Sequence, residues 1–374
     1  MITGEEKTPN PVLCTTLSTL TKITLTQFRN YGLASFAFPE QITCITGPNG
    51  SGKTNLLDAV YYLCYTKSYF SAQQLHTTKS GTEGFRVEGL FAGNEREQVV
   101  TCKWRAGKKE VAADGVEYER MADHIGRFTA VMIAPDDMAL INESSEGRRR
   151  WVDSILGQTN RQYLEQLLLY QRVLLQRNAW LKQQPVNPSP TRAELEYYDA
   201  RLTESGTYLH RQRAQFLKDF SPLLNDYYHR LSGGSETMVI NYESNLNQTT
   251  LATMLLQSFE QDLRLQRTTR GVHRDELLFS IGDFSLRQYG SQGQKKSFLF
   301  ALKLAQYTYI TNSLGKRPIL LLDDVFEKLD QQRMEALLTI IQGDAFGQVI
   351  LTDTHAERVR NAFGPEVQIG NIML

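Results

Sequence analysis

The sequence has no charge imbalance, few cysteines and no long apolar run. Lysine plus arginine equal aspartate plus glutamate at 41 each, so any nucleic-acid binding would need a local basic surface. No apolar stretch reaches the roughly 20 residues of a membrane span, and no signal-peptide core is present, so we expect a soluble, cytoplasmic protein. The four cysteines form no C-x-x-C pair, which argues against zinc and disulfides: Cys14, Cys44, Cys64 and Cys102.

The composition is otherwise that of a folded protein. At 374 residues and 41% hydrophobic, the chain can form two or three packed units. Residues 1–20 have no periodic pattern and are expected to be a flexible leader. Strands are expected at residues 21–27 and 42–46, followed by an antiparallel β meander that begins near Phe85 and turns at Asp114-Gly115.

The middle of the chain, from about residue 145 to 233, has a helical pattern. Three prolines between residues 183 and 191 forbid a regular helix there, which predicts a short helical hairpin. Ser221-Pro222 resembles a cap followed by a first-turn proline and predicts a new helix. Leucine or phenylalanine recurs every seven residues on one stripe: Leu195, Leu202, Leu209, Phe216 and Leu223.

The C-terminal part returns to alternating strands and helices. Strands are expected at residues 277–281, 319–322 and 348–352, and helices at 292–313 and 331–341. We therefore predict an α/β fold, in which a discontinuous head carries an antiparallel β lobe and an inserted helical domain. The expected divisions are a leader at 1–20, head parts at 21–144 and 261–374, and the insert at 145–260.

A complete G-x-x-x-x-G-K-[ST] loop follows the apolar strand at 42–46 and precedes an apolar helix. Its glycines let backbone amides point at phosphates, and the helix N-terminus adds a favourable partial charge. Lys53 is expected to reach the β and γ phosphates of ATP, and the Thr54 hydroxyl to bind Mg²⁺. The candidate nucleotide-binding residues here are Gly47, Pro48, Asn49, Gly50, Ser51, Gly52, Lys53, Thr54 and Asn55.

The apolar strand at 319–322 ends in Asp323 and Asp324. A buried strand delivers such carboxylates to the edge of the sheet where phosphates bind. Asp323 is therefore predicted to hold Mg²⁺, and Asp324 to orient or deprotonate the attacking water. Because Asp-Asp pairs also cap helices, this interpretation depends on the loop at Lys53.

The spacing favours one subclass of P-loop protein. Lys53 and Asp323 are separated by far more chain than in a small GTPase, so a large insertion must intervene. A short motif before Asp323 stands where ABC ATPases carry the signature loop, which contacts the γ phosphate bound by a partner head. Its residues are Ser291, Gln292, Gly293 and Gln294.

Two further segments complete the ABC-type pattern. Leu329-Asp330 resembles the D-loop that crosses a head-to-head interface. His355 stands where a switch histidine would sense the γ phosphate, and plain packing at a helix start is an equal alternative.

With these motifs, the chain resembles the RecF family of bacterial DNA repair proteins, relatives of the SMC heads. The resemblance covers roughly residues 21–360. It departs from the family at residues 68–71, where an arginine is common, and at Glu327, where serine is usual. The matching segments are residues 25–31, 47–54, 134–137, 148–153, 170, 176–178, 273–275, 291–294 and 322–326.

The resemblance implies a function. It implies ATP-dependent dimerisation, slow ATP hydrolysis, and binding to duplex DNA or single-strand/duplex junctions in DNA replication, recombination and the SOS response to DNA damage. It also implies RecO and RecR as partners in loading RecA, and places Arg29 and Asn30 near the nucleotide phosphates.

Basic residues of two groups are possible DNA phosphate contacts, with a solvated helix face as the alternative. Among them, Arg148, Arg149 and Arg150 are expected to make packing or partner contacts instead. The first group is Arg148, Arg149, Arg150, Arg161, Arg172, Arg177 and Lys182, and the second is Arg264, Arg267, Arg270 and Arg274.

The residues are also compatible with two other functions. One is a transporter-type ABC subunit, which would need a compact helical subdomain before the signature loop. The other is an ATP-switched DNA clamp that binds nucleotide and hardly hydrolyses it.

Overall fold

The computed structural model describes residues 16–17, 19–71, 73–93, 96–183, 192–234, 236–325 and 330–374. Most of the expected leader, the proline-rich tip and residues Glu327, Lys328 and Leu329 of the D-loop lie outside these ranges. The first long strand begins at Thr19, two residues before the expected strand. Within the described ranges no helix is long and apolar enough to cross a membrane.

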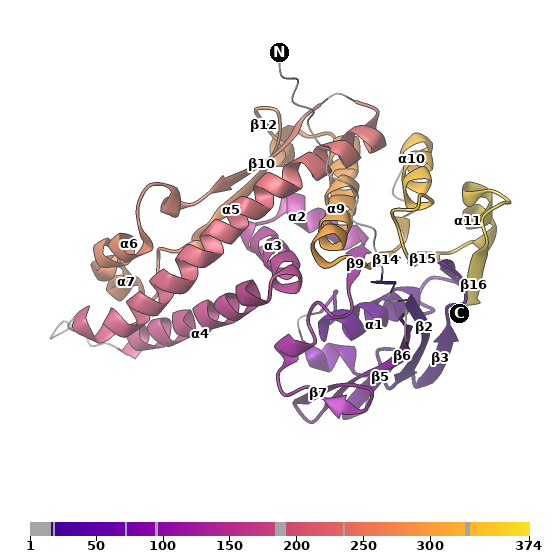
Figure 1. Cartoon of the computed structure of the whole chain (residues 1–374), viewed down its shortest axis with the longest axis horizontal. Helices are drawn as coiled ribbons and strands as arrows, with labels where there is room; N and C mark the ends of the chain where they lie inside the picture. Colours follow the sequence, from indigo (N-terminus) through magenta and orange to yellow (C-terminus); the bar gives the residue numbers. More distant parts are fainter. Residues whose placement is uncertain are drawn as a thin grey trace, which may run out of the picture.

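A five-stranded parallel sheet lies at the centre of the head (Figure 1). Its strand order is β16-β4-β15-β14-β9. Four strands are buried along their whole length, as expected of a parallel sheet that is covered on both faces. The strands are β4 (Ile42–Thr46), β9 (Ala130–Ile133), β14 (Ile319–Leu322), β15 (Val349–Asp353) and β16 (Ile369–Met373).

The central sheet separates two hydrophobic cores, because successive side chains of a strand point to opposite faces. Leu321 and Ile350 belong to the core that contains helix α1 (Lys53–Tyr65). Leu320 and Leu351 belong to the core on the other face, which is covered by helices of the C-terminal part. Those helices are α9 (Gln292–Leu314), α10 (Gln331–Ile341) and α11 (Ala356–Phe363).

The predicted antiparallel lobe is present as a six-stranded sheet in the order β3-β2-β5-β6-β7-β8. Helix α1 contacts both this sheet and the central sheet, so nearly all of its residues are buried. The turn between the last two strands falls at the predicted Asp114-Gly115. The strands are β2 (Thr19–Thr26), β3 (Leu33–Ala37), β5 (Gly84–Ala92), β6 (Glu97–Arg105), β7 (Lys108–Ala113) and β8 (Val116–Glu117).

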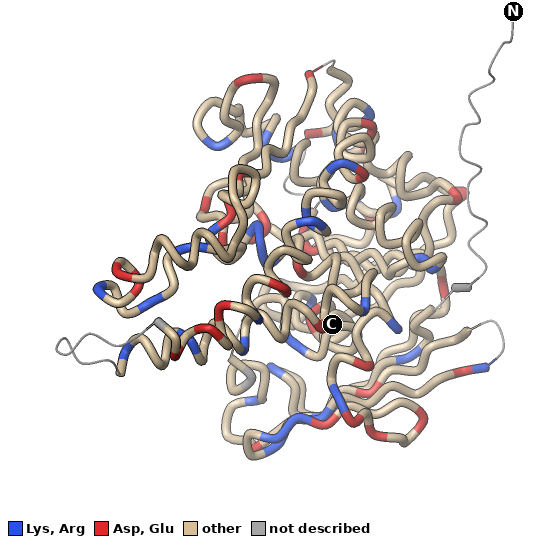
Figure 2. The backbone as a smooth tube through the Cα atoms, turned by 60° about the vertical axis from the view of Figure 1, so that its left-hand side comes forward, with Lys and Arg blue, Asp and Glu red and all other residues tan. Residues whose placement is uncertain are grey.

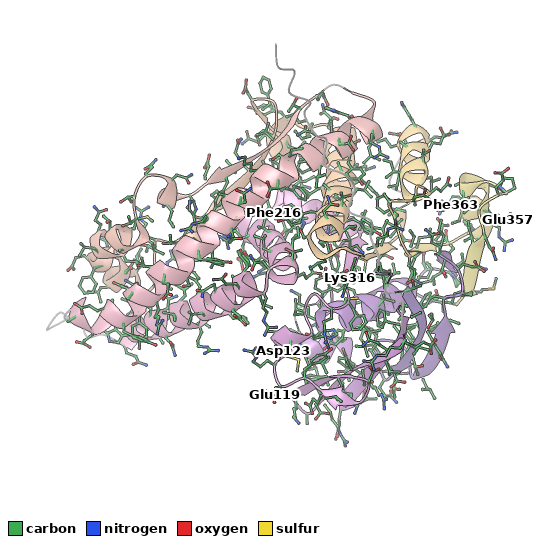
Figure 3. The ribbon with its side chains drawn as sticks, in the orientation of Figure 1. Glu119, Asp123, Phe216, Lys316, Glu357 and Phe363 are labelled. Carbon is green, nitrogen blue, oxygen red and sulfur yellow. The ribbon has the colours of Figure 1, made fainter. Side chains whose placement is uncertain are left out.

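The inserted helices form an arm beside the head (Figure 1). Helix α3 (Ser145–Thr159) leads into α4 (Arg161–Gln183), which packs on α5 (Glu196–Ser232) as the predicted hairpin. Helix α5 also packs on α9, and Phe216, labelled in Figure 3, is buried at that junction. This hairpin differs from the compact subdomain that a transporter-type subunit would need.

The predicted helix start at Ser221-Pro222 is wrong, because Pro222 lies inside the continuous helix α5. The Ser221 hydroxyl donates to the Leu217 carbonyl, 2.7 Å away, instead of capping a new helix. Phe220 and Leu224 on either side are fully buried in the core, and this packing keeps the helix continuous through a residue that lacks an N–H.

A three-stranded antiparallel sheet was not predicted. Strand β10 (Met238–Glu243) pairs with β11 (Glu276–Ile281), which pairs with β12 (Phe284–Ser285). Two short helices, α6 (Leu251–Gln257) and α7 (Phe259–Leu265), lie between the first two strands. The expected domain boundary at residues 260 and 261 is therefore misplaced, because it falls inside α7 and divides this sheet.

Several short elements complete the described fold. Strand β1 pairs with β13, and α2 and α8 flank the start of the arm and the start of α9. The described cysteines, Cys44, Cys64 and Cys102, are free and buried. The short elements are β1 (Thr16–Leu17), β13 (Lys316–Arg317), α2 (Ala139–Asn142), α8 (Leu286–Tyr289), η1 (Gln74–Thr77), η2 (Met121–Asp123), η3 (Pro135–Met138), η4 (Arg192–Leu195), η5 (Asn245–Asn247) and η6 (Val272–Arg274).

Candidate nucleotide site

The P-loop joins the end of β4 to the start of α1, at the edge of the central sheet. Gly47, Gly50 and Gly52 have φ of 152°, 81° and 114°, which other residues rarely adopt. A Cβ on Gly52 would stand 2.6 Å from the Asn30 side chain, so this glycine is also required for space. The remaining loop residues, Pro48, Asn49 and Ser51, lie between these glycines.

Lys53 is the first residue of α1 and is 5% exposed. Its ammonium donates to the carbonyls of Gly47 and Pro48, at 2.8 and 3.1 Å. The charge is thereby held inside the curve of the loop, where backbone amides and a helix N-terminus favour an anion.

Thr54 and Asp323 meet across the gap between α1 and β14. The Thr54 hydroxyl lies 3.0 and 3.1 Å from the two Asp323 carboxylate oxygens, although 269 positions separate the residues. Thr352 at the end of β15 donates to the same carboxylate at 2.9 Å. Burial raises the pKa of Asp323 to about 6, the two threonine hydroxyls oppose that shift, and the neighbouring Asp324 charge adds to it.

This donor set fits Mg²⁺. Magnesium prefers hard oxygen ligands, and nucleotide enzymes bind it through one or two protein oxygens together with substrate phosphates. Thr54 and Asp323 supply a hydroxyl and a carboxylate at the mouth of the P-loop. When bound with ATP, the ion would neutralise charge on the phosphates.

Asp324 has a φ of 48°, a left-handed conformation that is unusual for a residue with a side chain. Its backbone N–H donates to the Thr352 hydroxyl at 2.9 Å, which fixes the turn after β14. Such strained residues cluster at functional sites, where the surrounding structure holds them in place.

The segment after β2 binds the outside of the P-loop. Asn30 donates from its amide to the Ser51 carbonyl at 3.0 Å and accepts from Asn55 at 2.8 Å. The Tyr31 hydroxyl donates to the Gly52 carbonyl at 3.1 Å. Asn30 and Asn55 thus support the loop through hydrogen bonds to its backbone and to each other.

Arg29, which the family resemblance places near the nucleotide phosphates, makes polar contacts within the chain. Its guanidinium makes an ion pair with the fully buried Asp58 of α1, at 2.7 Å, and donates to the Ser68 hydroxyl at 2.8 Å. Ser68 is one of the residues that depart from the family pattern. The role of Asp58 was not predicted from the sequence. The one indication of it was a lone carboxylate in an otherwise apolar helix.

The signature segment forms the N-terminus of α9. The Ser291 hydroxyl accepts from the Gln294 backbone at 3.1 Å, and the Gln294 side chain accepts from the Ser291 backbone at 2.8 Å, so the two residues form a capping box. Gln292 and Gly293 are the first two helical residues. Within the described ranges, no hydrogen bond joins this segment to residues 47–54 of the same chain.

His355 precedes α11, and its backbone N–H donates to Asp353 at 2.7 Å. This is the helix-start role considered from the sequence. The residue also lines a cavity of about 750 Å³ together with Thr46, Gly47 and Pro48, so it lies beside the beginning of the P-loop. The structure therefore brings His355 to the nucleotide-binding edge of the sheet.

The proposed DNA-contacting residues of the insert differ in exposure, and Arg149 is half-buried and donates to the Asp275 carbonyl. Arg177 is fully buried in ion pairs with Asp199 and Asp262, so it cannot meet a phosphate backbone. Arg148 is also buried and packs over the Phe279 ring, in agreement with the predicted packing role. The exposed members are Arg150, Arg161, Arg172 and Lys182.

The fold and the site together define a class. A parallel sheet with a P-loop, a Thr–Asp pair at its edge, an antiparallel β lobe and a capped signature helix is an ABC-type ATPase head. The family model for the RecF/RecN/SMC N-terminal domain matches residues 19–372. A solved SMC head bound to a winged-helix domain of ScpA has the same fold, with a TM-score of 0.52 at 17% identity.

Proteins with higher sequence identity to this chain identify the family within this class. The DNA replication and repair protein RecF of Flavobacterium johnsoniae is 39% identical over 91% of this chain and 95% of its own length. The RecF of Cytophaga hutchinsonii is 39% identical over 90% of this chain and 89% of its own length. A solved structure of the recombination mediator protein RecF with ATP superposes with a TM-score of 0.84, at 27% identity and 95% coverage of both chains. This chain belongs to the RecF family.

Proposed function

We propose that this protein is a cytoplasmic ATPase of DNA replication and recombinational repair, which binds DNA when ATP joins two heads. The observation that carries the proposal is the meeting of Thr54 and Asp323 beside the P-loop. It is supported by relatives that are named DNA replication and repair protein RecF, and by the solved RecF structure with ATP.

The residues of the nucleotide site would each have a separate role in binding and hydrolysing ATP. The loop amides and Lys53 would bind the phosphates, while Thr54 and Asp323 would hold Mg²⁺ on them. Asp324 would orient or deprotonate the attacking water, and His355 would contact the γ phosphate. Arg29 would approach the nucleotide phosphates, and its contacts in this structure run from Nε and Nη2 to Asp58 and from Nη1 to the His76 carbonyl.

The catalytic site would be completed by a second copy of the chain. Among the described residues, no hydrogen bond joins the N-terminus of the signature helix to residues 47–54 of the same chain, and its partial positive charge suits a phosphate bound by a partner. Ser291, Gln292, Gly293 and Gln294 would then seal ATP between two heads. Slow, dimer-dependent hydrolysis would follow, because each site depends on the other chain.

DNA would bind to exposed arginines near α7 and before β11. These residues are solvent-exposed, and none has a carboxylate partner in the part of the chain that the structure describes. Figure 2 shows residues of both charge signs along much of the chain, so DNA binding would depend on a local basic surface such as this group would form. The group consists of Arg264, Arg267, Arg270 and Arg274.

The partners proposed for this step are RecO, RecR and RecA. The solved RecF structure is described as part of the RecFOR pathway, which supports a role in placing RecA on gapped DNA with RecO and RecR. Duplex DNA and single-strand/duplex junctions are the proposed substrates.

Sedimentation tests the proposed dimer. The wild type should dimerise with ATP and Mg²⁺, whereas Ser291→Arg should bind ATP and remain monomeric because a bulky cation occupies the interface. Lys53→Met should fail to bind ATP. If the wild type binds ATP and stays monomeric at every concentration, the composite site is refuted, since mass action favours the dimer at high concentration.

Phosphate release separates the ATPase from a clamp with negligible hydrolysis. The wild type should release phosphate faster with gapped DNA than without it, and Asp324→Asn should lose most of this activity while still dimerising. Normal hydrolysis by Asp324→Asn would remove that residue from the mechanism.

A further inference from the structure

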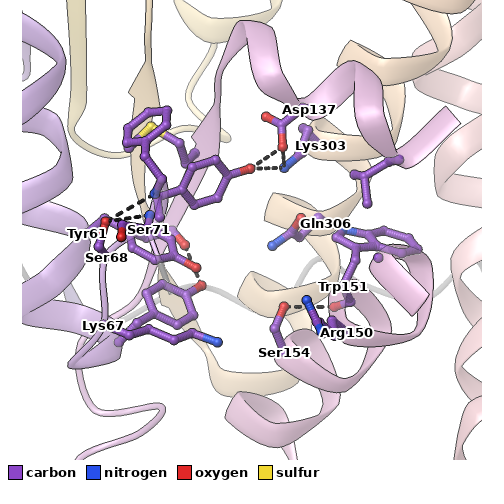
Figure 4. Close-up of a pocket in the computed structure, with 17 residues that line it drawn as sticks. Tyr61, Lys67, Ser68, Ser71, Asp137, Arg150, Trp151, Ser154, Lys303 and Gln306 are labelled. Carbon is purple, nitrogen blue, oxygen red and sulfur yellow. Dashed lines mark hydrogen bonds and ion pairs between the residues drawn. The ribbon is translucent and has the colours of Figure 1, made fainter. Parts of the chain in front are cut away.

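A second hollow lies at the opposite end of α1 from the P-loop. It has a volume of about 590 Å³, which is within the range of small-molecule sites. Lys53 begins α1 and Tyr65 ends it, so the two sites are about 18 Å apart along the helix axis. This hollow, which we call the α1–α3 hollow, lies between the end of α1, α3 and the middle of α9 (Figure 4).

One wall of the α1–α3 hollow is aromatic. Tyr61 and Tyr65 are stacked with ring centroids 4.1 Å apart and an interplanar angle of 11°, and Tyr69 meets Tyr61 edge-on. Trp151 lies on the opposite wall (Figure 4). Burial raises the pKa of the Tyr61 and Tyr65 hydroxyls above the usual value, so both rings are neutral. These walls suit a planar, apolar ring.

Two cations face each other at the edge of the hollow. Figure 4 shows Lys67 on the Tyr61 side and Arg150 on the Trp151 side. Lys67 has no carboxylate partner among the described residues, and Arg150 has only the exposed Glu146. Partial desolvation and the charge of Arg150 lower the pKa of Lys67. An anion between these side chains would relieve their repulsion and accept hydrogen bonds from both.

The buried polar groups of the hollow point to the same kind of ligand. Gln306 is 5% exposed, and its carbonyl oxygen accepts from Trp151 at 2.9 Å. Its amide nitrogen makes no hydrogen bond to any described residue and points into the hollow in Figure 4. The Tyr61 hydroxyl likewise has no partner in the described ranges. The Gln306 amide nitrogen, Lys67 and Arg150 can only donate hydrogen bonds, and the Tyr61 hydroxyl can donate one. Together these groups fit a ligand that is rich in acceptors.

A contact between the arm and the β lobe beside the hollow favours a short ligand. A neighbouring hollow of about 350 Å³ shares Tyr65, Lys67, Arg150 and Ser154 with the first, so the two are adjacent. Ala122 also lines this neighbouring hollow, and its carbonyl accepts a hydrogen bond from Arg161 of the arm at 2.9 Å. Arg161 also donates to Asp123 at 2.5 Å, so these hydrogen bonds form a bridge between the arm and the β lobe beside the hollow. This bridge favours one compact unit over a polynucleotide that passes through.

We propose that the α1–α3 hollow binds one nucleoside monophosphate unit, with the base between the tyrosine stack and Trp151 and the phosphate between Lys67 and Arg150. A base offers ring-nitrogen acceptors to the Gln306 amide, adenine included, and a phosphate offers three oxygens to the cations. The unit could be a free nucleotide or the phosphorylated end of a DNA strand, which share this chemistry. The site is separate from the P-loop and does not depend on the proposed ATPase function.

Calorimetric titration with AMP and with dAMP tests the site in the full-length protein. We expect saturable binding of one molecule per chain, and retention of this binding in Lys53→Ala. Lys67→Gln and Arg150→Gln should each weaken it about tenfold or more, because each removes a charge-assisted hydrogen bond. Lys67→Arg should restore most of the affinity, and the exposed Lys103→Gln on β6 is the matched control.

Competition distinguishes the two sources of the ligand. A 5′-phosphorylated oligonucleotide that displaces AMP indicates a strand end, and one that does not indicates a free nucleotide. Circular single-stranded DNA should not displace AMP, and displacement by it would overturn the one-unit model. The proposal also fails if neither nucleotide binds the wild type, or if Lys53→Ala abolishes binding while Lys67→Gln and Arg150→Gln leave it unchanged.

Discussion

Lys303 Nζ lies 2.7 Å from Asp137 Oδ1, and the two side chains are only 4% and 5% exposed. The Tyr69 hydroxyl completes the cluster, donating to Asp137 and accepting from Lys303 at 2.8 Å. These residues come from α9, η3 and the segment after α1. Tyr69 is also bound through its backbone to Asp58, the partner of Arg29, so polar contacts run from the P-loop side of the head to the signature helix.

Breaking this buried pair should destabilise the head. Lys303→Met leaves Asp137 without its cation in the interior, and we expect the free energy of unfolding to fall by about 3 to 5 kcal/mol. Urea denaturation measures the change. The double variant Lys303→Met/Asp137→Leu removes both charges and should recover much of the loss, so equal stability of the single and double variants would show that the pair is not the cause.

Removing an oxygen ligand from the proposed Mg²⁺ site should slow hydrolysis strongly with little effect on folding. We expect Thr54→Val and Asp323→Asn each to reduce phosphate release by about 10²-fold or more, because a catalytic metal ion supplies several kcal/mol of charge stabilisation. The reduction should be measured over a range of Mg²⁺ concentrations. Thr339→Val, an exposed change on α10, is the control, and wild-type rates in Thr54→Val would contradict the assignment.

Stability should fall as the pH falls because of His273. Burial lowers its pKa to about 4, whereas an unfolded histidine titrates near 6.5, so the unfolded chain takes up its proton first. This contribution is complete above about pH 6.5 and is lost toward pH 4, by about 3 kcal/mol. His273 Nδ1 lies 2.7 Å from the Tyr170 hydroxyl and Nε2 lies 3.1 Å from the Thr268 carbonyl.

Urea denaturation of the wild type and of His273→Gln between pH 4.5 and 7.5 checks this linkage. Glutamine does not titrate, so the variant should lose less stability across this range than the wild type. Parallel pH profiles for the two proteins would assign the dependence to other groups.

Replacing the proline inside α5 should stabilise the protein. Pro222 is exposed and interrupts the hydrogen bonds of a 37-residue helix, and Pro222→Ala restores a donor there. We expect a gain of about 2 kcal/mol, since the benefit in the helix exceeds the entropy that proline removes from the unfolded chain. Thermal unfolding measures it, with Lys218→Ala as a control on the same helix. A lower melting temperature would mean that α5 needs the proline.

The sequence correctly predicted those helices and strands that are determined by residues close together in the chain. Strand β14 and helix α10 have the predicted bounds, because an apolar run and a helical period each determine an element without help from distant residues. The P-loop and the Ser291 cap are also local patterns, and the structure forms both. Asp323 was predicted because a strand end must lie at the edge of a parallel sheet.

Other features depend on partners that are distant in the sequence. Nothing near Arg29 indicates that Asp58 binds it, and nothing near Lys303 indicates Asp137. The pairing of β10 with β11 was missed because two helices separate the strands. The predicted helix start at Pro222 was wrong for a related reason. The local preference of proline for the first turn of a helix was overridden by packing on α9, which holds α5 as one helix.

Helix α9 has the mechanical properties of a rod. It is about 35 Å long, and its residues from Ser297 to Tyr307 are continuously buried, with no glycine or proline after Gly293 at which it could bend. Ser291 caps one end, while Lys303 and Gln306 border the α1–α3 hollow further along. A displacement of these two residues must therefore move Ser291 by a comparable amount, and the fit between the two heads of the proposed dimer would become sensitive to events far from the nucleotide.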